Sequence, residues 1–167
     1  AIYGKIINGS QQDDFVIKSG HLNRHPVVTS LSNSENIVVA YSNYQQGMLC
    51  KIYDQNANQV GGEILISDNL SVAGSVGRST LVTPLSNGNF VATWEVVDGD
   101  TYDIYSQIRG SSGQLVRETF LVNEHSQGIK NSLTSMALED DFVISWVSGD
   151  AIQPNVIPAH NVHAQRF

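Results

Sequence analysis

The chain is poor in several residue types, and each shortage narrows the interpretation. It has a single cysteine, Cys50, so no disulfide can form within one chain. Cys50 lies in an apolar, strand-like run, and we expect it to be buried as a small hydrophobic residue. No apolar run approaches the roughly 18 residues that a helix needs to span a bilayer, so we expect no insertion into a membrane.

Positive charge is also scarce. Nine lysine and arginine residues stand against sixteen aspartate and glutamate residues, and the formal net charge at pH 7 is −7. A chain of this charge is repelled by phosphate backbones and by anionic membrane surfaces. We therefore expect no nucleic acid partner.

Helical periodicity is missing as well, as is any N-cap followed by an apolar stripe of helical period. The sequence has instead short runs of β-branched and aromatic residues bounded by Gly, Asn, Asp or Ser, which are typical of strands. With 167 residues, 41% of them hydrophobic, the chain is long enough for one domain with a core and too short for two comfortable ones. The sequence predicts a single all-β domain over residues 1–167.

One pattern occurs three times: a leucine, a polar turn, an apolar run and an aromatic residue. The aromatic residues are Tyr41, Trp94 and Trp146, which are 53 and 52 residues apart. A period of about 50 residues with strand-like content is typical of arrays of small sheets, because one unit cannot bury its own apolar face. The units span approximately residues 15–54, 64–109 and 119–167, with an extra strand at 1–7.

Four kinds of strand recur in fixed order, and turns such as Asn87-Gly88 suit tight hairpins between the first and second kinds. Three complete four-stranded units leave one surplus strand of the third kind, at one end of the chain. We expect it to pair by ring closure, with a second chain or with a neighbouring repeat. The strands of the four kinds are predicted, in turn, at 27–31, 81–85 and 133–138; at 37–41, 90–94 and 142–146; at 2–7, 48–53, 104–109 and 162–167; and at 15–18, 64–67 and 120–123.

The best-matching segments are Asn87-Gly-Asn-Phe-Val-Ala-Thr-Trp94, Ile104-Tyr-Ser-Gln-Ile108 and Phe120-Leu-Val-Asn123. They resemble the tandem repeats of about 50 residues in large secreted and cell-surface bacterial proteins, including adhesin-like and calcium-dependent exported proteins. The resemblance implies a secreted or cell-surface location, blades of four antiparallel strands like those of a β-propeller, and no catalytic residue within the motif.

Three blades are too few to close a ring comfortably, since propellers typically have four or more, whereas two chains could close a six-bladed ring with twofold symmetry. The sequence therefore predicts three four-stranded antiparallel repeats arranged like propeller blades, and a homo-oligomer, most simply a dimer. A closed threefold fold, either a β-trefoil or a β-prism, is the alternative, because it accommodates three repeats in one chain.

The repeated aromatic residues could stack on sugar rings. Strand alternation argues against this, because Phe90, Ala92 and Trp94 share one apolar face, as do Phe142, Ile144 and Trp146. We expect these aromatic residues to pack in the core.

The loops after the second kind of strand form the expected ligand site. They follow the same strand in each unit, so a ring or a threefold fold would place them on one rim, and loops on a rigid scaffold carry recognition. Their rings, amides and carboxylates match the faces and hydroxyl groups of sugars. The predicted ligand-binding residues are Asn43, Tyr44, Asp100, Tyr102 and Asp150. Ordinary hydrophilic loops are the alternative.

Three carboxylates lie within six residues, around Gly99. Such an oxygen-rich turn suits Ca²⁺, although the regular spacing and the glutamate of an EF-hand loop are missing. The candidate calcium ligands are Asp98, Asp100 and Asp103, with a solvated acidic turn as the alternative. We expect no other cofactor.

The sequence contains no motif for nucleophilic, zinc-dependent or phosphate-binding catalysis. The five histidines are expected at the surface, because pairs such as His160 and His163 would point to opposite faces of a strand. The sequence thus predicts a non-enzymatic glycan-binding or adhesive module, with weak sites that act together through avidity. A structural spacer whose partners are copies of itself is the alternative function.

Overall fold

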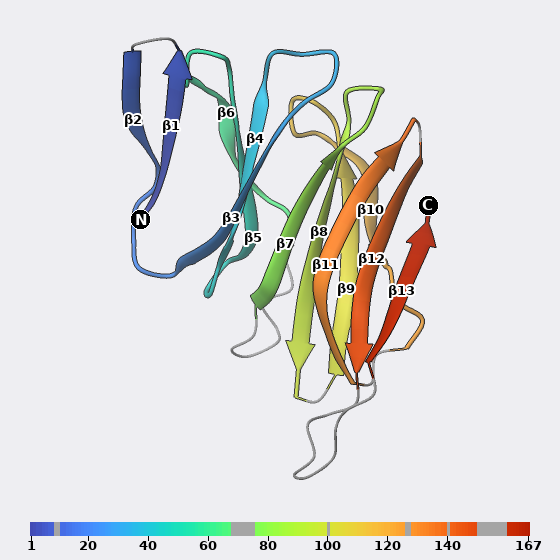
Figure 1. Ribbon diagram of the computed structural model, residues 1–167. Helices are drawn as coiled ribbons and strands as arrows, with labels where there is room; N and C mark the ends of the chain where they lie inside the picture. Colours follow the sequence, from blue (N-terminus) through green and yellow to red (C-terminus); the bar gives the residue numbers. More distant parts are fainter. Residues whose placement is uncertain (9–10, 68–75, 100, 126–127, 140, 150–159) are drawn as a thin grey trace.

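The computed structural model describes residues 1–8, 11–67, 76–99, 101–125, 128–139, 141–149 and 160–167. In this part of the chain it shows thirteen strands, all antiparallel to their neighbours, and no helix (Figure 1). The all-β prediction is confirmed. No helix in the described ranges is long and apolar enough to cross a membrane.

The strands form four sheets, which follow one another along the chain. The N-terminal hairpin consists of β1 (Ile2–Asn8) and β2 (Gln11–Lys18). The β3–β6 sheet consists of β3 (Asn23–Ser30), β4 (Ile37–Asn43), β5 (Gly47–Tyr53) and β6 (Gln59–Leu65). The β7–β10 sheet consists of β7 (Val76–Pro84), β8 (Phe90–Asp98), β9 (Thr101–Arg109) and β10 (Leu115–Leu121). The C-terminal sheet consists of β11 (Ile129–Leu138), β12 (Asp141–Gly149) and β13 (His160–Arg166).

Each predicted strand has a counterpart, and the largest differences concern the fourth kind. Strands β6 and β10 begin at Gln59 and Leu115, several residues before the apolar runs that predicted them. Backbone pairing with β5 and β9 starts directly after the turns and includes polar residues, which an apolar pattern does not mark.

Turn chemistry explains the hairpins between the first two strands of each sheet. In the turn before β8, the backbone N–H of Leu85 donates to the carbonyl of Asn89 at 2.8 Å, and Gly88 has a φ of 87°. The turn before β4 has no glycine at the corresponding place, and Asn33 adopts the left-handed conformation there, with a φ of 61°.

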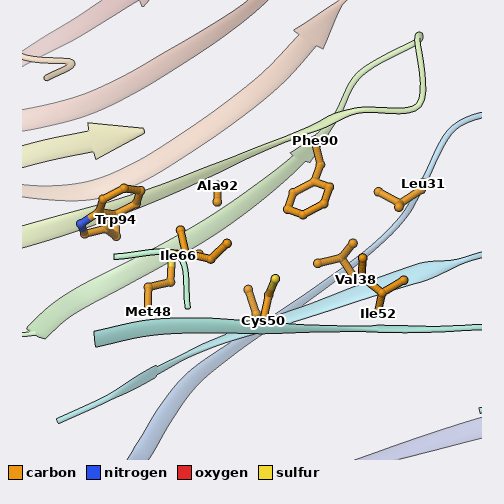
Figure 2. Packing of buried hydrophobic residues seen from close by; sticks show 10 residues of the cluster. Leu31, Val38, Met48, Cys50, Ile52, Ile66, Phe90, Ala92 and Trp94 are labelled. Carbon is orange, nitrogen blue, oxygen red and sulfur yellow. The ribbon is translucent and has the colours of Figure 1, made fainter. Parts of the chain in front are cut away.

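The sheets stand in a row and pack face to face, because both faces of each four-stranded sheet are apolar. In β4, Val38 and Ala40 pack towards β8, whereas Val39 and Tyr41 pack towards the N-terminal hairpin. Figure 2 shows the core between the two four-stranded sheets, including Phe90 and Trp94 of β8 and Cys50 of β5. A second core joins β8 to β12, and a third joins the hairpin to β4 and β5.

Two predictions about the core are confirmed. Cys50 is a free, fully buried thiol, and burial raises its pKa to about 12. Tyr41, Trp94 and Trp146 are buried, at 0%, 3% and 6% exposure, so strand alternation predicted their faces correctly.

A partly exposed cluster of charges holds the hairpin against the β3–β6 sheet. Lys18 Nζ donates to Glu63 at 2.6 Å, Tyr41 OH donates to the same carboxylate, and Lys51 Nζ donates to the carbonyl of Ile17 at 2.7 Å. Lys51 thus links β5 to the end of β2.

The described residues form no closed barrel, and the first and last sheets lie at opposite ends of the row (Figure 1). Strand β2 pairs with β1 and not with β13. The closed threefold alternative therefore finds no support in these residues, since it needs the two ends of the chain to meet.

Candidate functional site

The loops after β4 and β8 lie along the same side of the row of sheets. The turns before these two strands meet on the opposite side, where Asn33 Nδ2 donates to the carbonyl of Ser86 at 2.6 Å. Figure 1 shows that β8 and β12 also point the same way. The described members of the predicted ligand set are Asn43 and Tyr44 on one sheet and Tyr102 on the next, and they are not brought together in one pocket. Asp100 and Asp150 lie outside the described residues.

Asn43 shapes its loop from within. Its side-chain oxygen accepts hydrogen bonds from the backbone N–H groups of Gln45 and Gln46, at 2.9 and 3.1 Å. Its amide nitrogen donates to Asn23 Oδ1 at 2.7 Å, and the residue is only 8% exposed. This amide therefore closes the β4–β5 turn, as Asn commonly does at turns.

Tyr44 is the predicted stacking residue with the clearest exposure, at 41%. The guanidinium carbon of Arg24 lies 4.7 Å from its ring centroid, and Arg24 Nη1 donates to its hydroxyl at 3.3 Å. The other tyrosine, Tyr102, is partly buried and lies opposite Val97 in the β8–β9 hairpin.

The two described acids of the predicted calcium loop have different surroundings. Asp98 is exposed, whereas Asp103 Oδ1 accepts a hydrogen bond from Asn123 Nδ2 at 3.0 Å. Among the residues that the structure describes, no group of three or more His, Cys, Asp and Glu side chains is placed to hold a metal ion.

A pocket that the sequence did not predict lies between the β7–β10 sheet and the C-terminal sheet. Its volume is about 380 Å³. Its walls combine one indole, two imidazoles, one ammonium, one carboxylate and two amide side chains. The lining residues are Asn123, Glu124, His125, Lys130, Trp146, Ser148, His163, Ala164 and Gln165.

One wall of the pocket is a stacked pair of rings. The rings of Trp146 and His163 lie 5.4 Å apart between centroids and are inclined by 12°. His163 Nε2 is 2.6 Å from Ser148 Oγ, which fixes the orientation of the imidazole. Trp146 is nearly buried, whereas His163 is exposed, so the imidazole presents the accessible part of this wall.

The amine in the pocket is unusually buried for a lysine. Lys130, the second residue of β11, is only 2% exposed. Burial lowers the pKa of its ammonium group, while the negative charges of Asp103 and Glu95 oppose this shift. Glu95 is itself 1% exposed, so the three groups form a charged cluster next to the pocket.

The pocket lies where two positions of the repeat carry polar residues, His163 and Ser148, in place of larger or apolar ones. In the β7–β10 sheet, Tyr105 stacks on Trp94 with ring centroids 6.2 Å apart, and both Tyr105 and Val96 pack against the core. In the C-terminal sheet, His163 lies opposite Trp146, as Tyr105 lies opposite Trp94. Ser148 follows Trp146 by two residues, as Val96 follows Trp94. The alignment of the repeats contained this signal, but His163 was predicted only as a surface histidine.

No family model, curated protein or solved structure matches this chain. The function is therefore inferred from the geometry of the chain itself.

Proposed function

We propose that this chain is a non-catalytic, carbohydrate-binding repeat module. The observation that carries the proposal is the pocket of about 380 Å³ between the β7–β10 sheet and the C-terminal sheet. Asn123 on the lining donates to Asp103 of the predicted acidic loop at 3.0 Å, and the pocket has the size of a small polar ligand site.

The chemistry of the pocket suits a sugar ring. The exposed imidazole of His163, backed by Trp146, offers a flat surface for the apolar C–H face of a pyranose. Glu124 and Gln165 on the pocket lining can accept and donate hydrogen bonds to hydroxyl groups, and Lys130 can donate one. This combination of one flat wall and several polar groups is more specific than either feature alone.

Two further features belong to the same proposal. The sheets are blades of a propeller-like array, which is supported by the common strand order of the two four-stranded sheets and by the face-to-face cores. The module acts outside the cell or at its surface, as the resemblance of its repeats to exported bacterial proteins suggests.

The test is a glycan array with the purified chain, run in calcium and again in chelator, followed by calorimetry on the best ligand. We expect His163→Ala to weaken binding at least tenfold, about 1.4 kcal/mol, with an unchanged melting temperature. Tyr44→Ala is the matched control, since it removes an aromatic ring outside the pocket, and it should change affinity less than threefold.

Three results would count against this assignment. A blank array from folded protein would remove the carbohydrate function. Unchanged binding by His163→Ala with loss of binding by Tyr44→Ala would move the site to the rim loops. Loss of binding in chelator would implicate the acidic loop at 98–103 in place of a metal-independent pocket.

A further inference from the structure

The most exposed large apolar side chains of the described residues gather at the two ends of the row of sheets. Val162 is 80% exposed, Tyr3 68%, Val28 66%, Met136 60% and Val16 56%. Val162 and Met136 belong to the C-terminal sheet, Tyr3 and Val16 to the N-terminal hairpin, and Val28 to the β3 strand next to that hairpin. Exposed apolar residues concentrated in this way mark a contact surface.

The outer face of the C-terminal sheet repeats positions that are buried elsewhere. Val38 in β4 and Val91 in β8 point towards the next sheet in the row, and both are 0% exposed. Val143 in β12 follows Phe142 as Val91 follows Phe90, but it is only partly buried. Its partner across the strands is Met136, at 60% exposure.

The corresponding partner of Val91 is Thr83, which is only 4% exposed because the C-terminal sheet covers it. The C-terminal sheet has no sheet beyond it in the described residues, so its equivalent face is open. We call this surface the outer face. It consists of Met136, Val143, Val147 and Val162, which share one side of the three paired strands.

At the other end, the N-terminal hairpin covers only part of the β3–β6 sheet. A groove of about 310 Å³ runs beside β1, and its lining is mostly apolar. Val28 and Val39, which pair across β3 and β4, line this groove. The counterpart of Val28 in the next sheet is Val82, which is partly buried against the β3–β6 sheet, whereas Val28 is 66% exposed.

The strand count explains the groove. The hairpin has two strands where each four-stranded sheet has four, and the edge of β1 opposite β2 pairs with none of the described strands. The C-terminal sheet has three strands, and β13 likewise has one free edge. Open edges of this kind invite pairing with another chain.

We propose that two copies of this chain form a closed dimer in which the outer face of each C-terminal sheet fills the groove beside β1 of the other copy. The contact repeats one that the chain already makes between its two four-stranded sheets, where residues at the same strand positions are buried. One twofold axis fills both grooves at once, and it brings the free edge of β13 next to that of β1.

A second copy is the occupant because each chain carries both halves of the contact. On the outer face, Val143 is equivalent to Val38 and Val91 of the other sheets. In the groove, the pair Val28 and Val39 is equivalent to the pair Val82 and Ala92. This inference is independent of the proposed sugar site, since Trp146 and His163 face the β7–β10 sheet, on the other side of β12 and β13.

The test is sedimentation velocity of the purified chain from 1 to 100 micromolar, with three single variants. We expect the wild type to sediment at twice the monomer mass. Met136→Glu and Val28→Glu should each give monomers, and both should keep the wild-type circular dichroism spectrum, since these side chains are already exposed. Val116→Glu, on the outer strand β10 and 51% exposed, is the matched control and should remain dimeric.

Mixing the two disruptive variants tests which surfaces meet. A Met136→Glu copy keeps its groove and a Val28→Glu copy keeps its outer face, so a mixture should form a weak mixed dimer through one of the two contacts. A dimer in which the two outer faces met each other would survive Val28→Glu, and that result would overturn the proposal.

Other outcomes would also overturn it. A monomeric wild type at 100 micromolar would show that a different partner, such as a neighbouring repeat of a longer chain, covers these surfaces. A mass that keeps growing with concentration would show open head-to-tail chains, not a closed dimer.

Discussion

Replacing Phe90 by alanine tests whether the two four-stranded sheets are held together by their shared core. Phe90 is 0% exposed and contributes to the core between β8 and the β3–β6 sheet. A buried phenylalanine removes about 150–250 Å² from water, most of which alanine cannot replace. At about 25 cal/mol per Å², the transfer loss is about 3 kcal/mol, and the residual cavity raises the expected loss to about 3–5 kcal/mol.

A loss of this size is a large fraction of the total stability of a typical domain, about 5–15 kcal/mol. The assay is urea unfolding followed by tryptophan fluorescence and far-UV circular dichroism, because Trp94 belongs to the same core as Phe90. Val116→Ala, at an exposed position, is the control and should change stability by less than about 0.5 kcal/mol. A loss below about 1 kcal/mol for Phe90→Ala would refute the packing of these sheets through β8.

Three more predictions follow from single positions. Burial would raise the pKa of Glu63, but hydrogen bonds from Lys18 and Tyr41 and the charges of Lys18 and Lys51 outweigh burial and lower it. Glu63→Gln should therefore lower stability at pH 7 by about 0.5–1 kcal/mol. The difference from wild type in thermal melts should shrink as the pH falls from about 4.5 through the lowered folded-state pKa, because the carboxylate is then protonated, and a difference that stays constant until acid unfolding would contradict this. Gly113→Ala should lower the melting temperature by several degrees, because Gly113 has a φ of 88° and an added Cβ would lie 2.1 Å from Ile64 Cδ1; Gly99→Ala, in open space, is the control with the same sign of φ, and an equal loss in both would mean that only backbone strain matters. Cys50 should react with a thiol reagent only as fast as the chain unfolds, because it is fully buried with a pKa of about 12, and rapid labelling of the native chain would contradict its burial.

Much of the fold could be read from local patterns. Alternation in runs such as 90–94 reports which side chains share a face of a strand, and Asn87-Gly88 reports a tight turn, so the positions of the strands and the core faces followed without tertiary information. The grouping of strands into sheets did not follow, because β2 pairs with β1, and β6 and β10 belong to the preceding sheets and not to the units predicted at 64–109 and 119–167. The buried environment of Cys50 followed in the same way. Strand ends were less certain, since the first residues of β6 and β10 pair through the backbone whatever their side chains are.

The candidate site could not be read in the same way. Asn43 was expected to face a ligand, but its amide is used by the backbone of its own turn, a contact that depends on the loop conformation. The pocket brings together Lys130, Trp146 and His163 from three strands. The repeats align His163 with Tyr105 and Ser148 with Val96, but this alignment marks only changes of residue type and not a pocket. Only the register between β12 and β13 places His163 opposite Trp146.

The sequence by itself determined that this chain forms short antiparallel strands with repeated apolar faces, because alternation and turn residues act within a few positions of one another. The tertiary structure decided that β2 pairs with β1, that the C-terminal sheet keeps an open outer face, and that a pocket remains where His163 and Ser148 stand at the positions of Tyr105 and Val96. The physical reason is that backbone hydrogen bonding between strands does not depend on side-chain type, so which edges and faces remain uncovered is settled only when the sheets assemble.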